Sequence, residues 1–355
     1  MRAIEQEKTH IAQERTHIAS VNVSLTDNIA FLSTEKYHLY EDILDFIAYL
    51  SKTYVNHVTT IDIGKTAGGN PIRGIKISNT YLDEIAADDR LHPKIGGKSK
   101  RRKPAVWIDA GTHARERITV AMAVYYIKLL STNYPTNSSV ATLLDTYDFY
   151  IFPVVNPDGY NYTFTTDRLW RKNTSLNKTK CMGVDLNRNF GHKFTSTTYE
   201  KQRCNDSTFP GFKAFSELET QAIRDGVLKL RKSLKAFFTF HSFGQLWMTP
   251  YASSRVTPED YLDHIDALKA AEKAMKKVSS TRYYFGPIGK YFHLVTGSVI
   301  DWVYTEAKIK YAFAVEVRNK SSFILPESEI YPTANENFAA IEAILLKIRD
   351  EDEGT

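Results

Sequence analysis

Apolar side chains recur along this chain in two spacings, one typical of strands and one typical of helices. Short, almost continuously apolar runs predict buried central strands: Ala105–Ala110, Phe149–Val155, Ala236–Phe240 and Tyr311–Val317. Two further strands, Val58–Ile63 and Ile72–Ile77, flank the turn Ala67-Gly-Gly-Asn70. Apolar residues three and four apart predict helices between them: Glu35–Tyr54, Ile118–Leu130, Ala214–Leu230, Pro258–Val278 and Glu336–Ile348. This alternation predicts an α/β domain whose mixed sheet carries helices on both faces.

The first 30 residues differ from this pattern. A near-repeat of seven residues places Ile4, Ile11 and Ile18 on one helical stripe. So few repeats do not make a coiled coil, and we interpret the segment as a solvated helix with one face resting on another surface. We therefore divide the chain into residues 1–30 and a globular domain over residues 31–355.

Composition narrows the class of protein. The chain has 355 residues, 43% of them hydrophobic, so it can bury a large core and is not disordered. The basic run Lys98–Lys103 could bind heparin or nucleic acid, but a solvated loop is the ordinary reading, and we expect no nucleic-acid partner. The longest apolar stretch, Val120–Leu130, is too short to span a bilayer.

Cysteines and glycosylation sequons bear on the compartment. Cys181 and Cys204 could form a disulfide or remain separate thiols. Asn-X-Ser/Thr sequons favour the secretory route, and they begin at Asn22, Asn137, Asn161, Asn173, Asn177, Asn205 and Asn319. We therefore expect a secreted protein, although residues 1–30 lack the apolar core of a signal peptide.

One candidate metal site follows a predicted buried strand. His113 and Glu116 lie three residues apart at the start of a predicted helix, so both can reach one ion. The same spacing occurs at His38 and Glu41, inside the first predicted helix, where exposed surface side chains are the simpler interpretation. His241 directly follows another buried strand and is the candidate third ligand. A lone histidine at a strand end is more often structural, so spacing alone leaves this trio open.

Longer motifs resolve that ambiguity by resemblance. The sequence resembles the zinc carboxypeptidase family typified by the pancreatic digestive carboxypeptidases, in its secreted A/B branch. The similar stretches occur in the family's order from about residue 35 onward: Val106–Glu116, Val155–Tyr160, Asp167–Lys172, Cys181–Asn189, His241-Ser242, Gly297–Tyr304 and Lys310–Arg318. The resemblance implies a single domain with a mixed, mostly parallel, twisted eight-stranded sheet. It also implies that residues 1–30 are a helical remnant of the linker to an inhibitory propeptide, most of which is absent from this sequence.

The resemblance also assigns roles to individual residues. It implies one Zn²⁺ held by His113, Glu116 and His241, with Asp185 orienting the ring of the first histidine. It implies Glu316 as general base and Arg171 as the cation that stabilises the oxyanion. Substrate binding falls to Arg115, Asn187, Arg188, His293 and Ile300, and Cys181 and Cys204 match the family's disulfide. The substrate is then the C-terminus of a peptide or protein, and we expect the enzyme to be a monomer.

Ile300 corresponds to the floor of the family's side-chain pocket, which an acid would make selective for Lys or Arg. Met248, Val295 and Ala314 match apolar lining positions, so the sequence predicts preference for aliphatic or aromatic C-termini. Asp301 is adjacent, but the following tryptophan fixes the alignment.

Two positions depart from the family. His293 stands where a mobile tyrosine closes over the substrate, with Tyr291 two residues earlier, and Arg117 replaces a large aromatic. These departures leave an alternative, a catalytically weak or inactive member that binds peptide C-termini. An intracellular deglutamylase is a further option, which the sequons and cysteines disfavour.

Overall fold

The apolar runs form the middle of an eight-stranded sheet with the order β1-β2-β4-β3-β5-β8-β6-β7. The structure is a computed structural model that describes residues 32–79, 103–176, 182–195 and 206–354. The strands are β1 Val58–Lys65, β2 Pro71–Ile77, β3 Ala105–Asp109, β4 Asp148–Phe152, β5 Leu234–Ser242, β6 Leu246–Thr249, β7 Tyr284–Pro287 and β8 Tyr311–Val317. The predicted central strands correspond to β4, β3, β5 and β8, which are adjacent and mutually parallel. Antiparallel pairs β1–β2, β2–β4 and β6–β8 make the sheet mixed, as expected.

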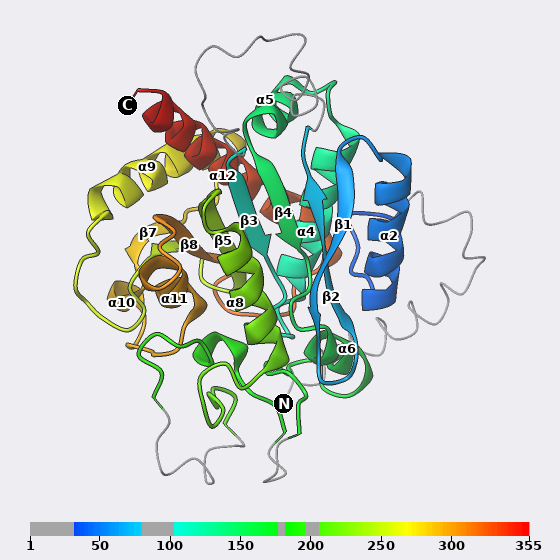
Figure 1. Cartoon of the computed structure of the whole chain (residues 1–355), viewed down its shortest axis with the longest axis vertical. Coiled ribbons are helices and arrows are strands. Elements are labelled where there is room, and N and C mark those ends of the chain that lie inside the picture. Colours follow the sequence, from blue (N-terminus) through cyan, green and yellow to red (C-terminus); the bar gives the residue numbers. More distant parts are fainter. Residues whose placement is uncertain (1–31, 80–102, 177–181, 196–205, 355) are drawn as a thin grey trace, which may run out of the picture.

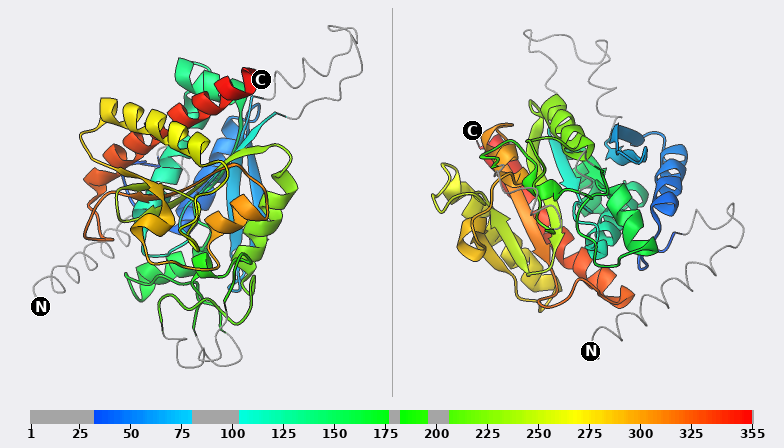
Figure 2. Two further views of the ribbon diagram at one scale, coloured as in Figure 1. Left: turned by 90° about the vertical axis from the view of Figure 1, so that its left-hand side faces the viewer. Right: turned by 90° about the horizontal axis from the view of Figure 1, so that it is seen from below.

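Helices cover both faces of this sheet (Figure 1). They are α2 Tyr40–Thr53, α4 Arg117–Thr132, α5 Ser138–Thr146, α6 Pro157–Thr165, α8 Leu218–Leu230, α9 Tyr261–Val278, α10 Ile288–Tyr291, α11 Val299–Thr305 and α12 Ile330–Glu353, with short 3₁₀ turns at Leu186–Arg188 and Glu327–Glu329. Figure 2 shows the sheet from its side, with α9 and α12 on one face and α8 on the other.

Side-chain alternation along the strands divides the core into two clusters, one on each face. In β3, Val106 and Ile108 pack with the cluster that includes α2, α4, α9 and α12. Trp107 packs with the opposite cluster, which includes α8 and α11. Because alternate residues of a strand face the same side, the polar residues that continue the Trp107 series point toward the face of α8 and α11. This alternation decides which strand residues can reach the active site.

Several predicted boundaries differ from the observed ones. The helix predicted from Ala214 begins at Leu218, because residues 214–217 form a loop in which Phe215 has φ of 53°. His241 was expected just after its strand but lies within β5, next to its end. His38 lies before α2 and hydrogen-bonds Ser33 O at 2.6 Å, so it does not belong to a helical pair with Glu41.

Some predictions fall outside the described residues. These include the helix of residues 1–30, most of the basic run Lys98–Lys103, and both Cys181 and Cys204. Within the described residues, no helix combines the length and apolar character needed to cross a membrane. The described sequons are not equivalent: Asn137 is exposed, whereas Asn173 is fully buried and donates to Glu217 and Glu219.

Candidate metal centre and active site

The residues singled out by the sequence converge at the carboxyl ends of the parallel strands. His113 and Glu116 lie in the connection from β3 to α4, where Glu116 immediately precedes the helix. His241 lies near the end of β5, and Glu316 is its direct register partner on β8. Ligands of open α/β sheets bind at this edge, so the backbone topology alone places these side chains together.

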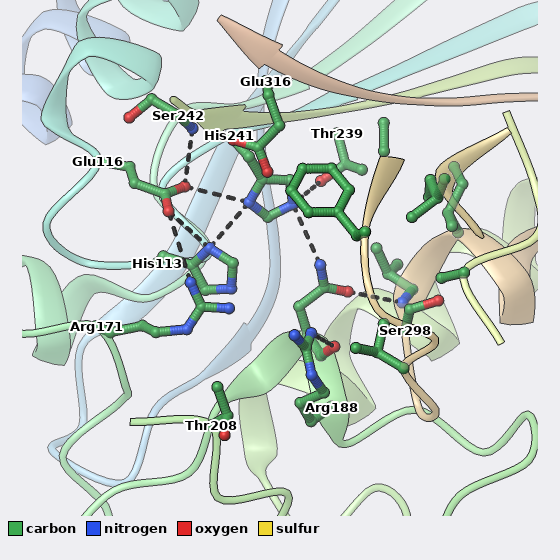
Figure 3. Close-up of a pocket in the computed structure, with 18 of the residues that line it drawn as sticks. His113, Glu116, Arg171, Arg188, Thr208, Thr239, His241, Ser242, Ser298 and Glu316 are labelled. Carbon is green, nitrogen blue, oxygen red and sulfur yellow. Dashed lines mark hydrogen bonds and ion pairs between the residues drawn. The ribbon is translucent and has the colours of Figure 1, made fainter. Parts of the chain in front are cut away.

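Three side chains meet as metal ligands would (Figure 3). His113 Nδ1 lies 2.9 Å from Glu116 Oε1 and 3.1 Å from His241 Nδ1, and His241 Nδ1 lies 3.2 Å from Glu116 Oε2. Ligands about 2.0–2.2 Å from a tetrahedral zinc ion are separated by roughly 3.3 Å. The observed spacings are close to this value, and all three residues are buried. Two imidazoles and one carboxylate are a donor set that fits zinc with a fourth position open.

Hydrogen bonds and nearby positive charge keep Glu116 positioned and ionised. Ser242 N donates to Oε2 at 3.1 Å, and Thr119 Oγ1 donates to the Glu116 carbonyl at 2.8 Å. Burial by itself would raise the pKa of Glu116, but the charges and hydrogen bonds of His113 and His241 outweigh it and hold the pKa well below its ordinary value. The group therefore stays ionised across the neutral range, as a metal ligand must.

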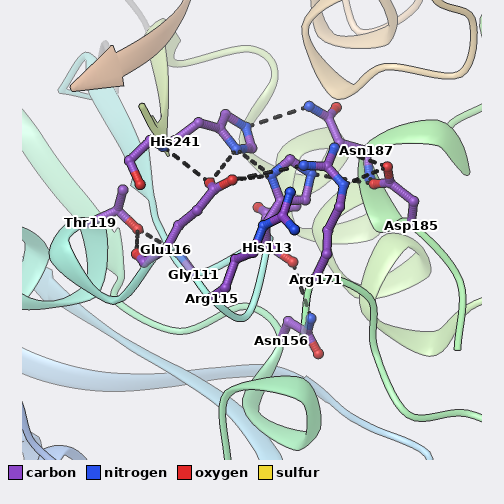
Figure 4. Close-up of polar contacts among 12 residues, drawn as sticks. Gly111, His113, Arg115, Glu116, Thr119, Asn156, Arg171, Asp185, Asn187 and His241 are labelled. Carbon is purple, nitrogen blue, oxygen red and sulfur yellow. Dashed lines mark hydrogen bonds and ion pairs between the residues drawn. The ribbon is translucent and has the colours of Figure 1, made fainter. Parts of the chain in front are cut away.

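Asp185 connects the first histidine to an arginine (Figure 4). Its Oδ1 lies 3.3 Å from His113 Nε2, and its Oδ2 accepts from Arg171 Nη2 at 2.9 Å and Nε at 3.0 Å. Arg171 Nη1 remains on the side of the cavity, 3.8 Å from Glu116 Oε1. Asp185 is fully buried, which opposes ionisation, yet Arg171 and Arg188 lower its pKa. Asp185 therefore lies behind His113, and its predicted role in orienting that ring stays a prediction.

Asn156 fixes the loops that carry these groups. Its side chain accepts from Gly159 N at the start of α6 and donates to Thr112 O and Lys172 O, each at 3.1 Å. Thr112 and Lys172 are the chain neighbours of His113 and Arg171. One buried amide therefore holds a metal-ligand loop and an arginine loop in fixed relation.

Asn187 and Arg188 lie on the short 3₁₀ turn that follows Asp185. Asn187 N donates to Asp185 Oδ1 at 3.0 Å, and Asn187 Oδ1 accepts from Val299 N at 2.9 Å. Arg188 Nη1 donates to Asn187 O at 2.8 Å. Figure 3 shows Arg188 entering the site from the side opposite Glu316. A planar guanidinium at this position is suited to bidentate binding of a carboxylate.

The site opens into a cavity of about 440 Å³. Charged and polar residues, among them Arg171, Arg188 and Glu316, line one part of it. The rest of the wall is largely apolar and includes Met248, Ala252, Ile288, Val295, Val299, Ile300 and Ala314. Asp301 does not line this cavity, because its carboxylate accepts from Ala252 N at 2.7 Å and Ser253 N at 2.8 Å. The structure therefore places Ile300, and not its acidic neighbour, at the wall.

The two departures from the family pattern lie in different places. His293 is exposed and lines the cavity, whereas the hydroxyl of Tyr291 donates to Phe285 O at 2.7 Å. Arg117 is buried away from the cavity, where its guanidinium lies 3.5 Å from the centre of the Phe164 ring. Arg117 is therefore not among the residues that line the cavity.

Comparison with known proteins decides the family. Residues 43–340 match the family model described as zinc carboxypeptidase. The chain belongs to the zinc carboxypeptidase family. Human carboxypeptidase A1 is 37% identical over 87% of this chain and 69% of its own length. Carboxypeptidase B of Astacus astacus is 31% identical over 88% of this chain and 97% of its own length. The structure of bovine thrombin-activatable fibrinolysis inhibitor in complex with tick carboxypeptidase inhibitor has a TM-score of 0.78 at 33% identity, covering 90% of this chain and 99% of that one.

This zinc carboxypeptidase is a peptide-bond hydrolase, and its His113, Glu116 and His241 fit one zinc ion. Sequence reasoning did not single out two aromatic residues at the cavity rim. Arg115 stacks over the Phe323 ring at 4.0 Å, and the Phe243 and Phe323 ring centres are 4.7 Å apart. It also gave no role to Asp109 and Thr239, which lie behind His241. The available signal was a charged residue ending an otherwise apolar strand.

Proposed function

We propose that this enzyme removes apolar residues from the C-termini of peptides and proteins. The observation that carries the proposal is the apolar cavity wall around Ile300, next to which the carboxylate of Asp301 is bound to two backbone N–H groups. An aliphatic or aromatic side chain gains free energy by leaving water for such a wall. A Lys or Arg side chain would lose hydration against these apolar residues, and the neighbouring Asp301 carboxylate is already bound to backbone N–H groups. The A-type and B-type relatives are similarly distant in sequence, so the wall is the better guide to preference.

The restriction to chain ends follows from the carboxylate clamp. Arg188 and the side chain of Asn187 bind the free terminal carboxylate between the metal ligands and the apolar wall. A bond in the middle of a chain has no such group to offer. Arg115, stacked on Phe323, contacts the residues that precede the scissile bond, and His293 donates a hydrogen bond at the entrance where the family has tyrosine.

The chemistry is shared between Glu316 and Arg171. His113, Glu116 and His241 would hold a zinc ion, which would supply a Lewis acid for the scissile carbonyl and lower the pKa of water toward neutrality. Glu316 takes the proton of the attacking water and passes it to the leaving amine. Burial, followed by the charge of Glu116, raises the pKa of Glu316 to about 8, and a divalent cation beside it favours the ionised, proton-accepting form. Arg171 Nη1 stabilises negative charge on the carbonyl oxygen, a contribution worth about 3 kcal/mol.

We further propose that the enzyme is secreted as a monomer, that Cys181 and Cys204 form a disulfide, and that residues 1–30 derive from a propeptide linker. The exposed sequon at Asn137 supports this route. Its Oδ1 caps α5 by accepting from Ser139 N and Val140 N, and the cap does not use its amide nitrogen, the atom that would carry a glycan.

The test is a scan of C-terminal residues with a peptide library, comparing the wild type with Glu316→Gln and Ile300→Asp. We expect Leu and Phe to be released faster than Lys or Arg by wild type, and Ile300→Asp to reverse the order. Glu316→Gln should keep its zinc and lose about 10²- to 10⁴-fold in kcat. Faster release of Arg by the wild type would refute the apolar preference, and stoichiometric zinc without turnover would favour a binding module.

A further inference from the structure

Strand register lines up three buried polar residues behind the metal site. Asp109 on β3 is the register partner of Thr239 on β5, and His241 follows two residues later on the same strand. Alternation places all three on one face, the face on which Trp107 and Phe237 stack at 6.1 Å. Their exposed fractions are 1%, 0% and 2%. All three side chains are almost fully buried, so each of their polar atoms needs a hydrogen-bond partner within the protein.

The hydrogen of the His241 ring can be assigned from its neighbours. Nδ1 faces His113 and Glu116 and must be free of hydrogen to bind zinc. The hydrogen of the neutral ring is then on Nε2. Nε2 has two neighbours at 3.4 Å, Thr239 Oγ1 and Asn187 Nδ2. Asn187 Oδ1 accepts from Val299 N, which identifies its Nδ2 as an N–H donor. Nδ2 therefore cannot accept the hydrogen of His241 Nε2. Among the described residues, the Thr239 hydroxyl is therefore the acceptor for His241.

If the Thr239 hydroxyl accepts a hydrogen bond from His241, its own hydrogen needs an acceptor. Asp109 Oδ2 already accepts from Trp107 Nε1 at 2.8 Å, whereas Oδ1 has no hydrogen bond of ordinary geometry within the described part of the chain. A buried carboxylate oxygen left without a donor costs about 1–3 kcal/mol. Burial raises the pKa of Asp109 to about 6, and its interaction with the Thr239 hydroxyl opposes that rise. The register of β3 on β5 places Asp109 beside Thr239, so Oδ1 is the acceptor that the Thr239 hydroxyl needs.

We propose that Asp109 is a positioning residue for the zinc site, which acts through the Thr239 hydroxyl to keep the His241 hydrogen on Nε2 and leave Nδ1 free for the metal. The opposite tautomer has a competing partner, because Glu116 Oε2 lies 3.2 Å from Nδ1. Asp185 lies directly beside His113 and orients its ring. Asp109, in contrast, orients His241 through the hydroxyl of Thr239. The proposal rests on the zinc site and is independent of the proposed apolar specificity.

Two substitutions break the connection in different ways. In Asp109→Asn, the amide oxygen satisfies Trp107 and the amide nitrogen faces Thr239. Thr239 then accepts from the amide and donates to His241 Nε2, which forces the hydrogen onto Nδ1. Thr239→Val removes the hydroxyl with almost no change of shape. Thr239→Ser retains the hydroxyl and is the matched rescue. Asp148→Asn is the control for loss of a buried carboxylate, because Asp148 pairs with Lys76 and lies at the start of β4, the opposite end of the sheet from His113.

The experiment measures the zinc dissociation constant of the full chain by competition with a chelating dye at pH 7.5. Unfolding of each metal-free variant in urea is followed in parallel. Loss of a partner that orients a metal ligand weakens metal binding about 10- to 100-fold, and we expect this of Asp109→Asn and Thr239→Val. Thr239→Ser and Asp148→Asn should stay within about twofold of wild type, although Asp148→Asn is less stable. Unchanged zinc affinity in the first two variants would overturn the proposal, and so would equal weakening in all four. Because no substrate is present, a failure of the proposed specificity leaves these outcomes unaffected.

Discussion

Gly297 joins the loop before α11 to the turn that carries Arg188, and its lack of a side chain is required there. Its φ is +69°, and a Cβ atom added to it would lie 2.0 Å from the Arg188 carbonyl oxygen. The two segments are also hydrogen-bonded: Phe190 N donates to Gly297 O at 3.0 Å, and Gly297 N donates to His192 O at 3.2 Å. Gly297→Ala should therefore displace Arg188, the proposed carboxylate clamp, while leaving the metal ligands in place.

The expected magnitude has two parts. Ordinary contact of a Cβ atom begins at 3.4 Å, so the two backbones must separate by about 1.4 Å (3.4 − 2.0). A misplacement of about 1 Å in a substrate-positioning group lowers activity on the order of 10²-fold. The left-handed conformation adds about 1–2 kcal/mol to the cost in stability, and the weakened hydrogen bonds add about 1 kcal/mol each.

The assay is kcat/KM for a blocked dipeptide with C-terminal Leu or Phe, together with zinc content and thermal unfolding. Gly69→Ala is the matched control, because Gly69 has φ of +85° and no atom within 4 Å of an added Cβ. Gly69→Ala should lose stability only through the cost of the left-handed backbone conformation, and it should keep full activity. Gly297→Ala should retain zinc and lose about 100-fold in kcat/KM. If its activity per folded molecule stays within about threefold of Gly69→Ala, the reasoning from the close approach to Arg188 is wrong.

Three further predictions concern stability, metal and modification. Burial, with a contribution from Glu217, raises the pKa of Glu219 from 4.5 to about 7; the folded chain therefore holds this proton longer than the unfolded chain, and stability falls as pH rises from about 4.5 to about 7. Urea unfolding at pH 5 and pH 7.5 measures how much free energy of unfolding is lost over this range. The loss should be smaller in Glu219→Gln than in wild type, by at most about 3 kcal/mol. An equal loss in both proteins would contradict the raised pKa of Glu219. Removal of zinc with a chelator should abolish activity and lower the unfolding temperature, and zinc at 100 times its dissociation constant should restore about 2.7 kcal/mol; activity that survives full removal would exclude a metal mechanism. In a secretory host, peptide mapping should find glycan on Asn137 and none on Asn173, which is fully buried; a glycan on Asn173 would contradict the packing found here.

The sequence predicted the central strands well because burial on both faces leaves a continuous apolar run. It did not predict β6, whose Leu246–Thr249 is too short to show a period, nor β7, where Tyr284–Pro287 contains glycine and proline. These strands exist because β8 offers β6 a partner, a tertiary effect that no local pattern contains.

The candidate site was predicted through motifs, and its geometry supports the metal ligands and their surroundings. The identity of a residue, however, does not indicate where its side chain points in the fold. Arg117 stood beside a metal ligand in the sequence, yet the first turn of α4 points it toward Phe164 and away from the cavity. Asn173 fits a sequon, yet its amide is consumed by two buried carboxylates. Asp109 was visible in a motif, but only the register of β3 on β5 connects it with His241.

The pairing of His241 with Glu316 across β5 and β8 has a consequence for how this scaffold can diversify. The spacing between a metal ligand and the proposed base is set by two adjacent strands about 4.8 Å apart in the middle of the sheet. Arg188, His293 and the segment leading to Ile300 lie instead on turns and short helices outside the sheet. Insertions and substitutions in those segments can change which C-terminus is accepted while the reacting groups keep their places. Loop grafting between relatives should therefore transfer substrate preference more readily than it damages turnover.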